Sequence, residues 1–113
     1  MPEVVLAKRL RRLPVATALG REVRVARGPL ARFLGLAYLN RVEAGSGLLI
    51  PRCSSVHTFG MRFPLDLYFL DERGALVCVR RLVPARRLAI CRRAKAVLEL
   101  PAAEGGEISA TKA

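Results

Sequence analysis

A long apolar run followed by a short turn limits the folds open to this 113-residue chain. Residues 65–71 read LDLYFLD, apolar at nearly every position, and DERG at 71–74 places a glycine where a hairpin turn favours positive φ. A strand that is apolar on both sides is typical of a sheet covered on both faces. We therefore predict a central strand over residues 65–71 that forms a hairpin with residues 75–83.

Shorter segments predict further strands and one helix. Three segments have the apolar or alternating pattern of strands: residues 22–26, 47–50 and 94–100. In the last of these, AKAVLEL, the residues Lys95, Val97 and Glu99 lie on the face opposite Leu98 and Leu100. The polar, glycine-containing residues 40–47 predict a loop, and the basic residues 84–93 predict irregular structure.

The predicted helix starts at a proline, which is favoured at the first helical position. In PLARFLGLAYL, residues 29–39, an apolar stripe is formed by Leu30, Phe33, Leu34 and Ala37. The segment before residue 14 stays open between helix and strand. Short elements separated by seven prolines and nine glycines favour a mainly β fold, and the length fits a single domain, 1–113, with residues 102–113 as a mobile tail.

The charge balance is strongly basic, with 20 Lys and Arg against nine Asp and Glu, a formal net charge of +11. Such a charge can attract polyanions. Most arginines are scattered in ones and twos, so we expect only nonspecific, salt-sensitive binding to nucleic acid. The exception is the segment from Arg80 to Lys95, which contains no acid and would suit an acidic protein partner.

Cysteine usage suggests a reducing compartment, and the hydropathy predicts neither secretion nor a membrane span. Cys53, Cys78 and Cys91 are odd in number and form no CxxC, so neither a disulfide framework nor a zinc site is predicted. No apolar stretch is long enough for a secretory signal or a membrane span. We expect a cytoplasmic monomer without a cofactor or metal.

The segment 47–77, GLLIPRCSSVHTFGMRFPLDLYFLDERGALV, followed by VLELPA, resembles the DUF192 family, uncharacterised proteins of bacteria and archaea. Arg32 with Gly35-Leu36 resembles the helix of that family. The string HTFGMRFP at 57–64, followed by Leu65 and Asp66, resembles one branch of it. The resemblance implies a compact antiparallel β-sandwich or barrel-like domain with one short helix near residues 29–38, and no established activity.

Polar residues beside the predicted central strand form the candidate ligand-binding site, because loops on rigid scaffolds tend to carry function. The candidates are His57, Phe59, Met61, Arg62 and Asp66. His57 is the only histidine and the natural acid–base group. The simplest role of this region is a non-enzymatic binding module for a small molecule.

Other roles stay open for the same residues. His57 with Asp66 or Cys53 could serve a hydrolase or transferase, although an extended 53–57 segment would hold Cys53 and His57 about 13 Å apart. Alternatively, His57 is fixed by hydrogen bonds in a loop. Asp66 then caps backbone N–H groups of residues 58–63 or pairs with Arg62.

Overall fold

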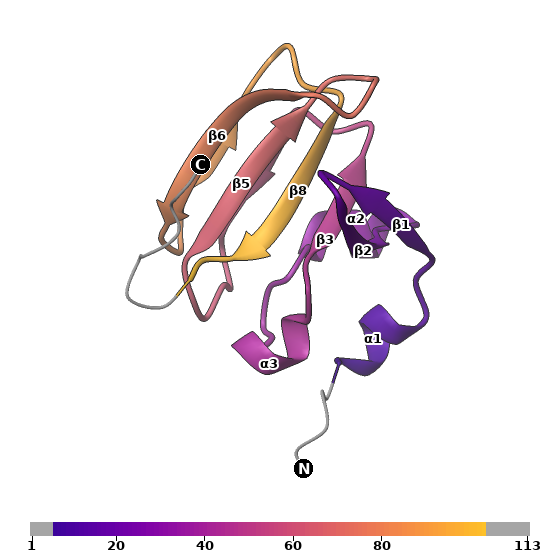
Figure 1. The fold of residues 1–113 in the computed structure, drawn as a ribbon. Helices are drawn as coiled ribbons and strands as arrows, with labels where there is room; N and C mark the ends of the chain where they lie inside the picture. Colours follow the sequence, from indigo (N-terminus) through magenta and orange to yellow (C-terminus); the bar gives the residue numbers. More distant parts are fainter. Residues whose placement is uncertain (1–5, 104–113) are drawn as a thin grey trace.

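The computed structural model describes residues 6–103, which form a six-stranded sheet, a separate two-stranded sheet and three short helices (Figure 1). The order of the large sheet is β1-β2-β3-β8-β5-β6. Its strands are β1 (Val15–Ala18), β2 (Arg21–Val25), β3 (Leu48–Pro51), β5 (Leu65–Leu70), β6 (Leu76–Val83) and β8 (Ala96–Pro101). The small sheet pairs β4 (Ser55–His57) with β7 (Leu88–Ile90), and the helices are α1 (Lys8–Arg11), α2 (Pro29–Leu34) and α3 (Arg41–Ala44). The prediction of a mainly β fold is confirmed.

The predicted hairpin is the β5–β6 pair, and β5 lies inside the sheet between β6 and β8. Its register with β8 is continuous from Leu65 opposite Pro101 to Leu70 opposite Ala96. Five of the six β5 residues are buried, as expected for an apolar run with neighbours on both sides.

The large sheet is mixed, whereas a wholly antiparallel arrangement was expected. Strands β2 and β3 run parallel. Parallel neighbours need a crossover connection, and here the chain passes through α2 and α3 between the two strands. This crossover contains α3 in addition to the expected α2, and the third helix of the described residues, α1, precedes β1.

Two predictions about irregular segments were wrong. The expected loop 40–47 contains α3, which Asn40 and Glu43 start with a capping box: each side chain accepts a hydrogen bond from the other residue's backbone N–H. The expected irregular segment 84–93 contains β7, because residues 88–90 pair antiparallel with β4. Three residues are too few for an alternating pattern to be recognised.

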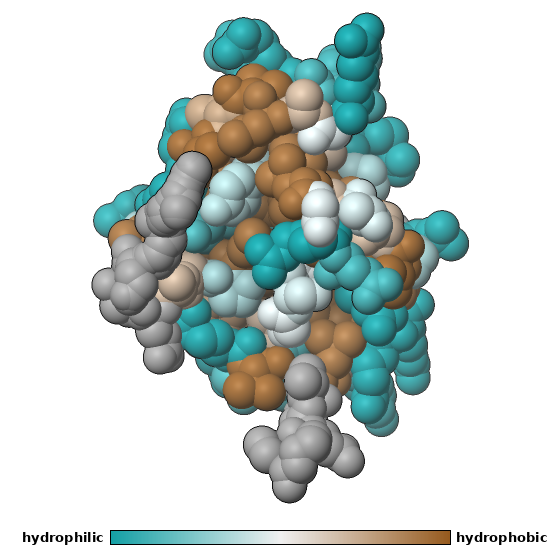
Figure 2. Space-filling view, viewed as in Figure 1, coloured by the Kyte–Doolittle hydropathy of each residue, from teal (hydrophilic) through white to brown (hydrophobic). Residues whose placement is uncertain are grey.

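Apolar side chains are buried on both faces of the sheet. The larger cluster includes Leu36, Ile50, Phe69 and Val97, on the face where α2 lies. A smaller cluster on the opposite face includes Leu98. In the view of Figure 2, apolar areas alternate with hydrophilic ones instead of forming one continuous patch.

The chain remains packed beyond β8 for at least one residue. Ala102 is buried, and its N–H donates a hydrogen bond of 3.0 Å to the carbonyl oxygen of Pro64. The rest of the predicted mobile tail, from residue 104, lies outside the described residues.

Candidate functional site

The turn after α2 is held by a side chain from β8. Glu99 Oε1 accepts a hydrogen bond of 3.2 Å from the backbone N–H of Leu36. The turn can approach this closely because Gly35 has no side chain: a Cβ there would lie 2.5 Å from Glu99 Oε1. Gly35 also has φ +57°, which favours glycine. The turn therefore packs directly on the Glu99 carboxyl group.

Arg9 of α1 holds the same turn from its carbonyl side. One guanidinium nitrogen donates 2.9 Å to the carbonyl oxygen of Gly35, and the other donates to that of Ala37. Desolvation lowers the pKa of Arg9, while Glu99 and Glu43 raise it. An arginine still keeps its charge at neutral pH, so it remains a cation bound to two carbonyls.

Glu99 is a buried carboxyl group with only 1% of its surface exposed. Burial raises its pKa to about 8, against the smaller opposing effects of the Leu36 hydrogen bond and the Arg9 charge. The group is therefore mainly a neutral acid at pH 7, able both to donate and to accept a hydrogen bond.

A cavity of about 540 Å³ opens above Glu99, which we call the Glu99 cavity. It lies between α2, the 50–57 segment, Leu88 of β7 and Glu99 of β8. Its polar lining consists of Arg32, Arg52, Cys53, Ser54, Ser55, His57 and Glu99. Its size falls within the range of small-molecule sites in proteins.

The second carboxyl oxygen of Glu99 reaches this cavity. Oε2 has no hydrogen-bond partner among the described residues. Every fully buried side-chain oxygen or nitrogen of the described residues has a hydrogen-bond partner. Because Oε2 is unpaired without being fully enclosed, and Glu99 lines the cavity, this oxygen is accessible from the cavity.

His57 forms the wall of the Glu99 cavity beside α2, with both ring nitrogens occupied. Nδ1 accepts a hydrogen bond of 3.2 Å from the backbone N–H of Phe59. Nε2 lies 2.9 Å from the carbonyl oxygen of Phe33, to which it donates. This pattern requires the neutral ring with its proton on Nε2. His57 therefore ties α2 to the loop that follows β4.

Beyond His57 lies a second concave site of about 400 Å³, which we call the aromatic pocket. Its lining is Phe33, Leu34, Ala37, Tyr38, His57 and Phe59. The centroid of the His57 ring lies 4.8 Å from that of Phe33 and 5.8 Å from that of Phe59. Phe33 and His57 belong to both cavities and separate them.

The residues of the predicted apolar stripe do not share one environment in the structure. Leu30 and Phe33 are 68% and 66% exposed, whereas Ala37 is buried. The helix ends at Leu34, before the stripe is complete, because the chain turns at Gly35. Phe33 is left as a wall of both cavities.

The sequence-predicted site residues do not all come together. His57 and Phe59 lie side by side at the aromatic pocket. Met61 is buried in the core, and Arg62 is exposed outside the linings of both cavities. A ligand contact by these two residues stays a prediction.

Asp66 lies elsewhere, at an irregularity between β5 and β6. The register shifts between Leu65 and Leu67, and Asp66 Oδ1 accepts a 2.8 Å hydrogen bond from the backbone N–H of Leu82. Leu82 has φ +53°, an unfavourable conformation for a residue with a side chain. The carboxylate stabilises this bulge, and its Oδ2 lies 3.5 Å from Arg81 Nε. Among the described residues, no hydrogen bond or ion pair joins Asp66 to His57.

Cys53 and His57 line the same cavity but are not hydrogen-bonded to each other. The Cys53 thiol donates 3.0 Å to the carbonyl oxygen of Ser55. With both His57 nitrogens bound to the backbone, the ring is not placed to take a proton from this thiol. Within residues 6–103, no group of three or more His, Cys, Asp or Glu side chains is arranged to hold a metal ion.

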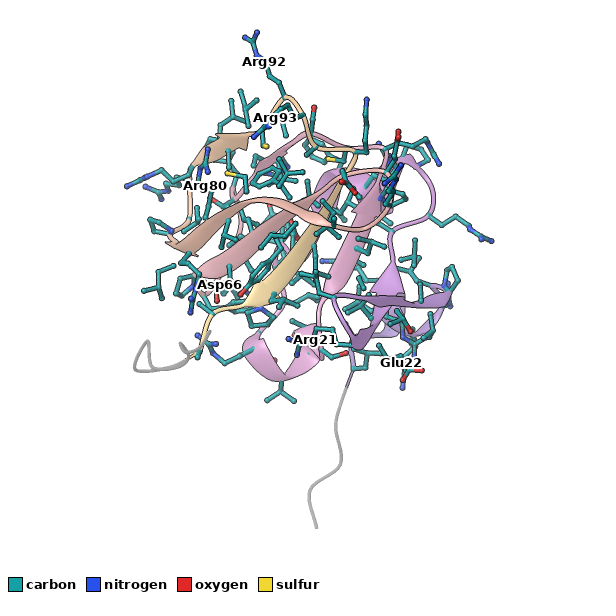
Figure 3. The ribbon with its side chains drawn as sticks, turned by 45° about the horizontal axis from the view of Figure 1, so that its top comes forward. Arg21, Glu22, Asp66, Arg80, Arg92 and Arg93 are labelled. Carbon is teal, nitrogen blue, oxygen red and sulfur yellow. The ribbon has the colours of Figure 1, made fainter. Side chains whose placement is uncertain are left out.

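Basic residues extend from both ends of the molecule. Figure 3 shows Arg92 and Arg93 on the loop between β7 and β8, far from Arg21 and Glu22 on the β1–β2 hairpin. Asp66 lies apart from both groups. Across the described part of the chain, no helix is long and apolar enough to cross a membrane.

Glu99, Phe33 and Tyr38 are the site residues that sequence reasoning missed. Glu99 was placed on one strand face with Lys95 and Val97 and was given no role in the site. Val97, on that same face, was the available signal that the face is apolar and packed. Phe33 was assigned to the apolar stripe of the helix, and nothing in the local pattern distinguished the exposed Tyr38 from a buried aromatic residue.

The fold and cavities define a small β-rich domain with a cavity of ligand size, floored by a buried acid. The chain belongs to the DUF192 family, described as "Uncharacterized ACR", which it matches over residues 14–110. The resemblance noted from residues 47–77 is therefore confirmed at the level of the family. No curated protein matches the sequence.

Solved structures share the fold. One is described as a "putative transcription regulator" from Sinorhizobium meliloti, with 24% identity and a TM-score of 0.63, over 77% of this chain and 76% of that chain. Another is a protein of unknown function from Novosphingobium aromaticivorans, with 19% identity and a TM-score of 0.57, over 77% and 69%. At these identities the similarity extends to the fold alone.

Proposed function

We propose that the protein is a non-enzymatic binding module that holds a small polar molecule in the Glu99 cavity. The observation that carries the proposal is Glu99 Oε2, an unpaired carboxyl oxygen on a buried side chain that reaches a cavity of about 540 Å³. A polar group in such a place is costly unless it gains a partner, and a ligand can supply that partner.

The protonation of Glu99 indicates the chemistry of the ligand. Because burial raises the Glu99 pKa to about 8, the neutral group offers one O–H donor and one acceptor at pH 7. An amide, a hydroxyl group or a neutral heterocycle can bind both the O–H donor and the acceptor oxygen. A ligand carboxylate can only accept the hydrogen bond from the O–H group. His57 and Phe33 supply the flat wall beside it.

Binding is favoured over the hydrolase or transferase alternative by the hydrogen bonds of the cavity. His57 is neutral and bound to the backbone through both nitrogens, and the Cys53 thiol is directed at Ser55. Neither group is arranged as a nucleophile–base pair. Cys53, Cys78 and Cys91 are free thiols, which supports a reducing compartment such as the cytoplasm.

A fragment screen by amide NMR tests the proposal. At pH 6.5, fragments that carry an amide or hydroxyl group should shift the amide signals of Ser54, Ser55 and Leu88. At pH 9 the deprotonated Glu99 should bind them less well, and Glu99→Gln should abolish this pH dependence because its amide stays neutral. Glu22→Gln, on exposed β2, is the matched control and should behave like the natural chain. Shifts that avoid the cavity, or the absence of any bound fragment, would contradict the proposal.

A further inference from the structure

The surface around the aromatic pocket is built by three segments with an unusual charge pattern. Residues 26–40, 50–65 and 84–95 contain nine Arg and Lys residues and no Asp or Glu. Hydrogen bonds show that the segments are neighbours: His57 donates to the carbonyl of Phe33, and Thr58 accepts from the backbone N–H of Arg87. Glu99, the acid near this surface, is buried beneath the turn and mainly neutral at pH 7. Within these three segments the charged side chains are therefore all arginines and lysines.

Half of the tyrosines and phenylalanines of the chain are exposed on this surface. The chain has four Phe and two Tyr. Phe33, Tyr38 and Phe59 are 66%, 60% and 55% exposed, and all three line the aromatic pocket. Exposed aromatic rings gathered at one concave site are characteristic of a binding surface.

These rings are held in position before anything binds. The His57 ring packs between Phe33 and Phe59. The backbone N–H of Tyr38 donates 2.8 Å to the carbonyl of Gly60, and a Cβ on Gly60 would lie 2.8 Å from the Tyr38 ring. Tyr38 thus lies directly against the Gly60 backbone. A fixed ring loses little entropy when a ligand stacks on it.

Arginines lie on the segments that build the pocket, and we call four of them the arginine collar: Arg32, Arg52, Arg86 and Arg87. Two of them are anchored next to the rings, because the backbone N–H groups of Arg86 and Arg87 both bind Thr58, which lies between His57 and Phe59. All except Arg32 are exposed. The planar guanidinium group suits phosphate and also stacks on bases.

We propose that the aromatic pocket and the arginine collar together bind single-stranded nucleic acid, with a base in the pocket and phosphates on the collar. Aromatic platforms beside a cationic groove are how proteins hold unpaired strands. A duplex keeps its bases stacked inside, and a flat lipid surface does not fill a concave pocket. This inference goes beyond the proposed function: the two sites share wall residues, but oligonucleotide binding does not need Glu99.

The positions of the arginines in the fold also bear on the expectation that nucleic-acid binding is only nonspecific. Scattered arginines in the sequence suggested only nonspecific binding to nucleic acid. In the fold, some of these arginines lie on the segments that carry the exposed rings. Bound bases could then stack on the rings, a contribution that nonspecific electrostatic binding lacks.

Fluorescence anisotropy with short labelled oligonucleotides tests the inference. A single-stranded DNA or RNA probe should bind about tenfold more tightly than an abasic strand of equal length and charge. Phe59→Ala should weaken binding of the natural strand about tenfold and leave binding of the abasic strand unchanged. Phe59 is largely exposed, so the variant should fold, and its melting temperature verifies this.

Charge variants separate the collar from the net charge. Arg86→Glu should weaken both strands and reduce the dependence of binding on salt. Arg21→Glu, on the β1–β2 hairpin and outside the linings of both cavities, changes the net charge equally and should have little effect. Equal binding of the two strands, or equal effects of the two variants, would overturn the inference. Tighter binding to anionic vesicles, duplex DNA or polyglutamate than to the single strand would also overturn it. Glu99→Gln should leave oligonucleotide binding intact, so this result is independent of the small-molecule proposal.

Discussion

Glu99 on the last described strand and Leu36 on the turn after α2 are joined by a 3.2 Å hydrogen bond between residues 63 positions apart. The bond fixes the turn above the sheet, and the cavity opens next to it. The same carboxyl group thus holds the turn and has a second oxygen that is accessible from the cavity.

Glu99→Gln should change how stability depends on pH. The Glu99 pKa rises from 4.5 in the unfolded chain to about 8 in the folded protein, so folding is favoured by protonation. This contribution is fully present below pH 4.5 and is lost as the pH rises through 8. The natural protein should lose up to about 1.4 kcal/mol per pH unit in this window relative to the Gln variant. Urea unfolding of both proteins from pH 4 to 9 measures the difference, and parallel curves would contradict the prediction.

Gly35→Ala should destabilise the protein far more than Gly74→Ala. Both glycines have positive φ, but a Cβ at Gly35 meets the Glu99 carboxyl group, whereas nothing lies within 4 Å of one at Gly74. We expect a loss of about 3 kcal/mol at Gly35 and about 1 kcal/mol at Gly74. Thermal or urea unfolding compares them, and equal losses would show that the close packing against Glu99 is unimportant.

Asp66→Ala should lower stability without reducing ligand binding. It removes the acceptor of the Leu82 N–H at the β5–β6 bulge, which we expect to cost about 2 kcal/mol. Asp66→Asn keeps an acceptor oxygen and should recover most of the loss. Hydrogen exchange should show faster exchange of the Leu82 amide in the Ala variant only. Reduced fragment binding by Asp66→Asn with unchanged stability would instead assign Asp66 to the binding site.

His57→Ala should loosen the loop after β4 without affecting the β5–β6 bulge. The Phe59 N–H loses its acceptor, Nδ1 of His57, and the Phe33 carbonyl loses its donor. A lost hydrogen bond of about 1 kcal/mol corresponds to roughly fivefold faster exchange of the Phe59 amide. The Leu82 amide is the internal control and should keep its exchange rate. The reverse result, with Leu82 affected and Phe59 unchanged, would mean that His57 supports a different part of the fold.

Local patterns predicted the strands that carry strong apolar signals. The run in β5 and the turn after it indicated the hairpin, because burial on both faces leaves few polar positions. The helix α3 was missed although Asn40 and Glu43 have the spacing of a capping box. Four residues are too few for a helical period to show, so the capping pair was the only local signal there.

The candidate site depends on contacts between distant parts of the chain, which local patterns do not contain. His57 and Phe59 were identified from their chemistry, and the structure places them together. Glu99 became a site residue only because the turn at Gly35, far earlier in the chain, packs on it. Asp66 needed a partner, as expected for a buried carboxylate, but its partners are Leu82 and Arg81 on β6 instead of the 58–63 loop or Arg62.

The ionisation of Glu99 is the most direct test of a neutral acid at the floor of a ligand cavity. The carboxyl ¹³C chemical shift of Glu99, followed by NMR as a function of pH, reports this ionisation without a ligand. We predict a single titration with a midpoint of about 8, caused by burial. A midpoint near 4.5, the ordinary value for glutamate, would show that the group is an exposed or paired carboxylate and would contradict the account.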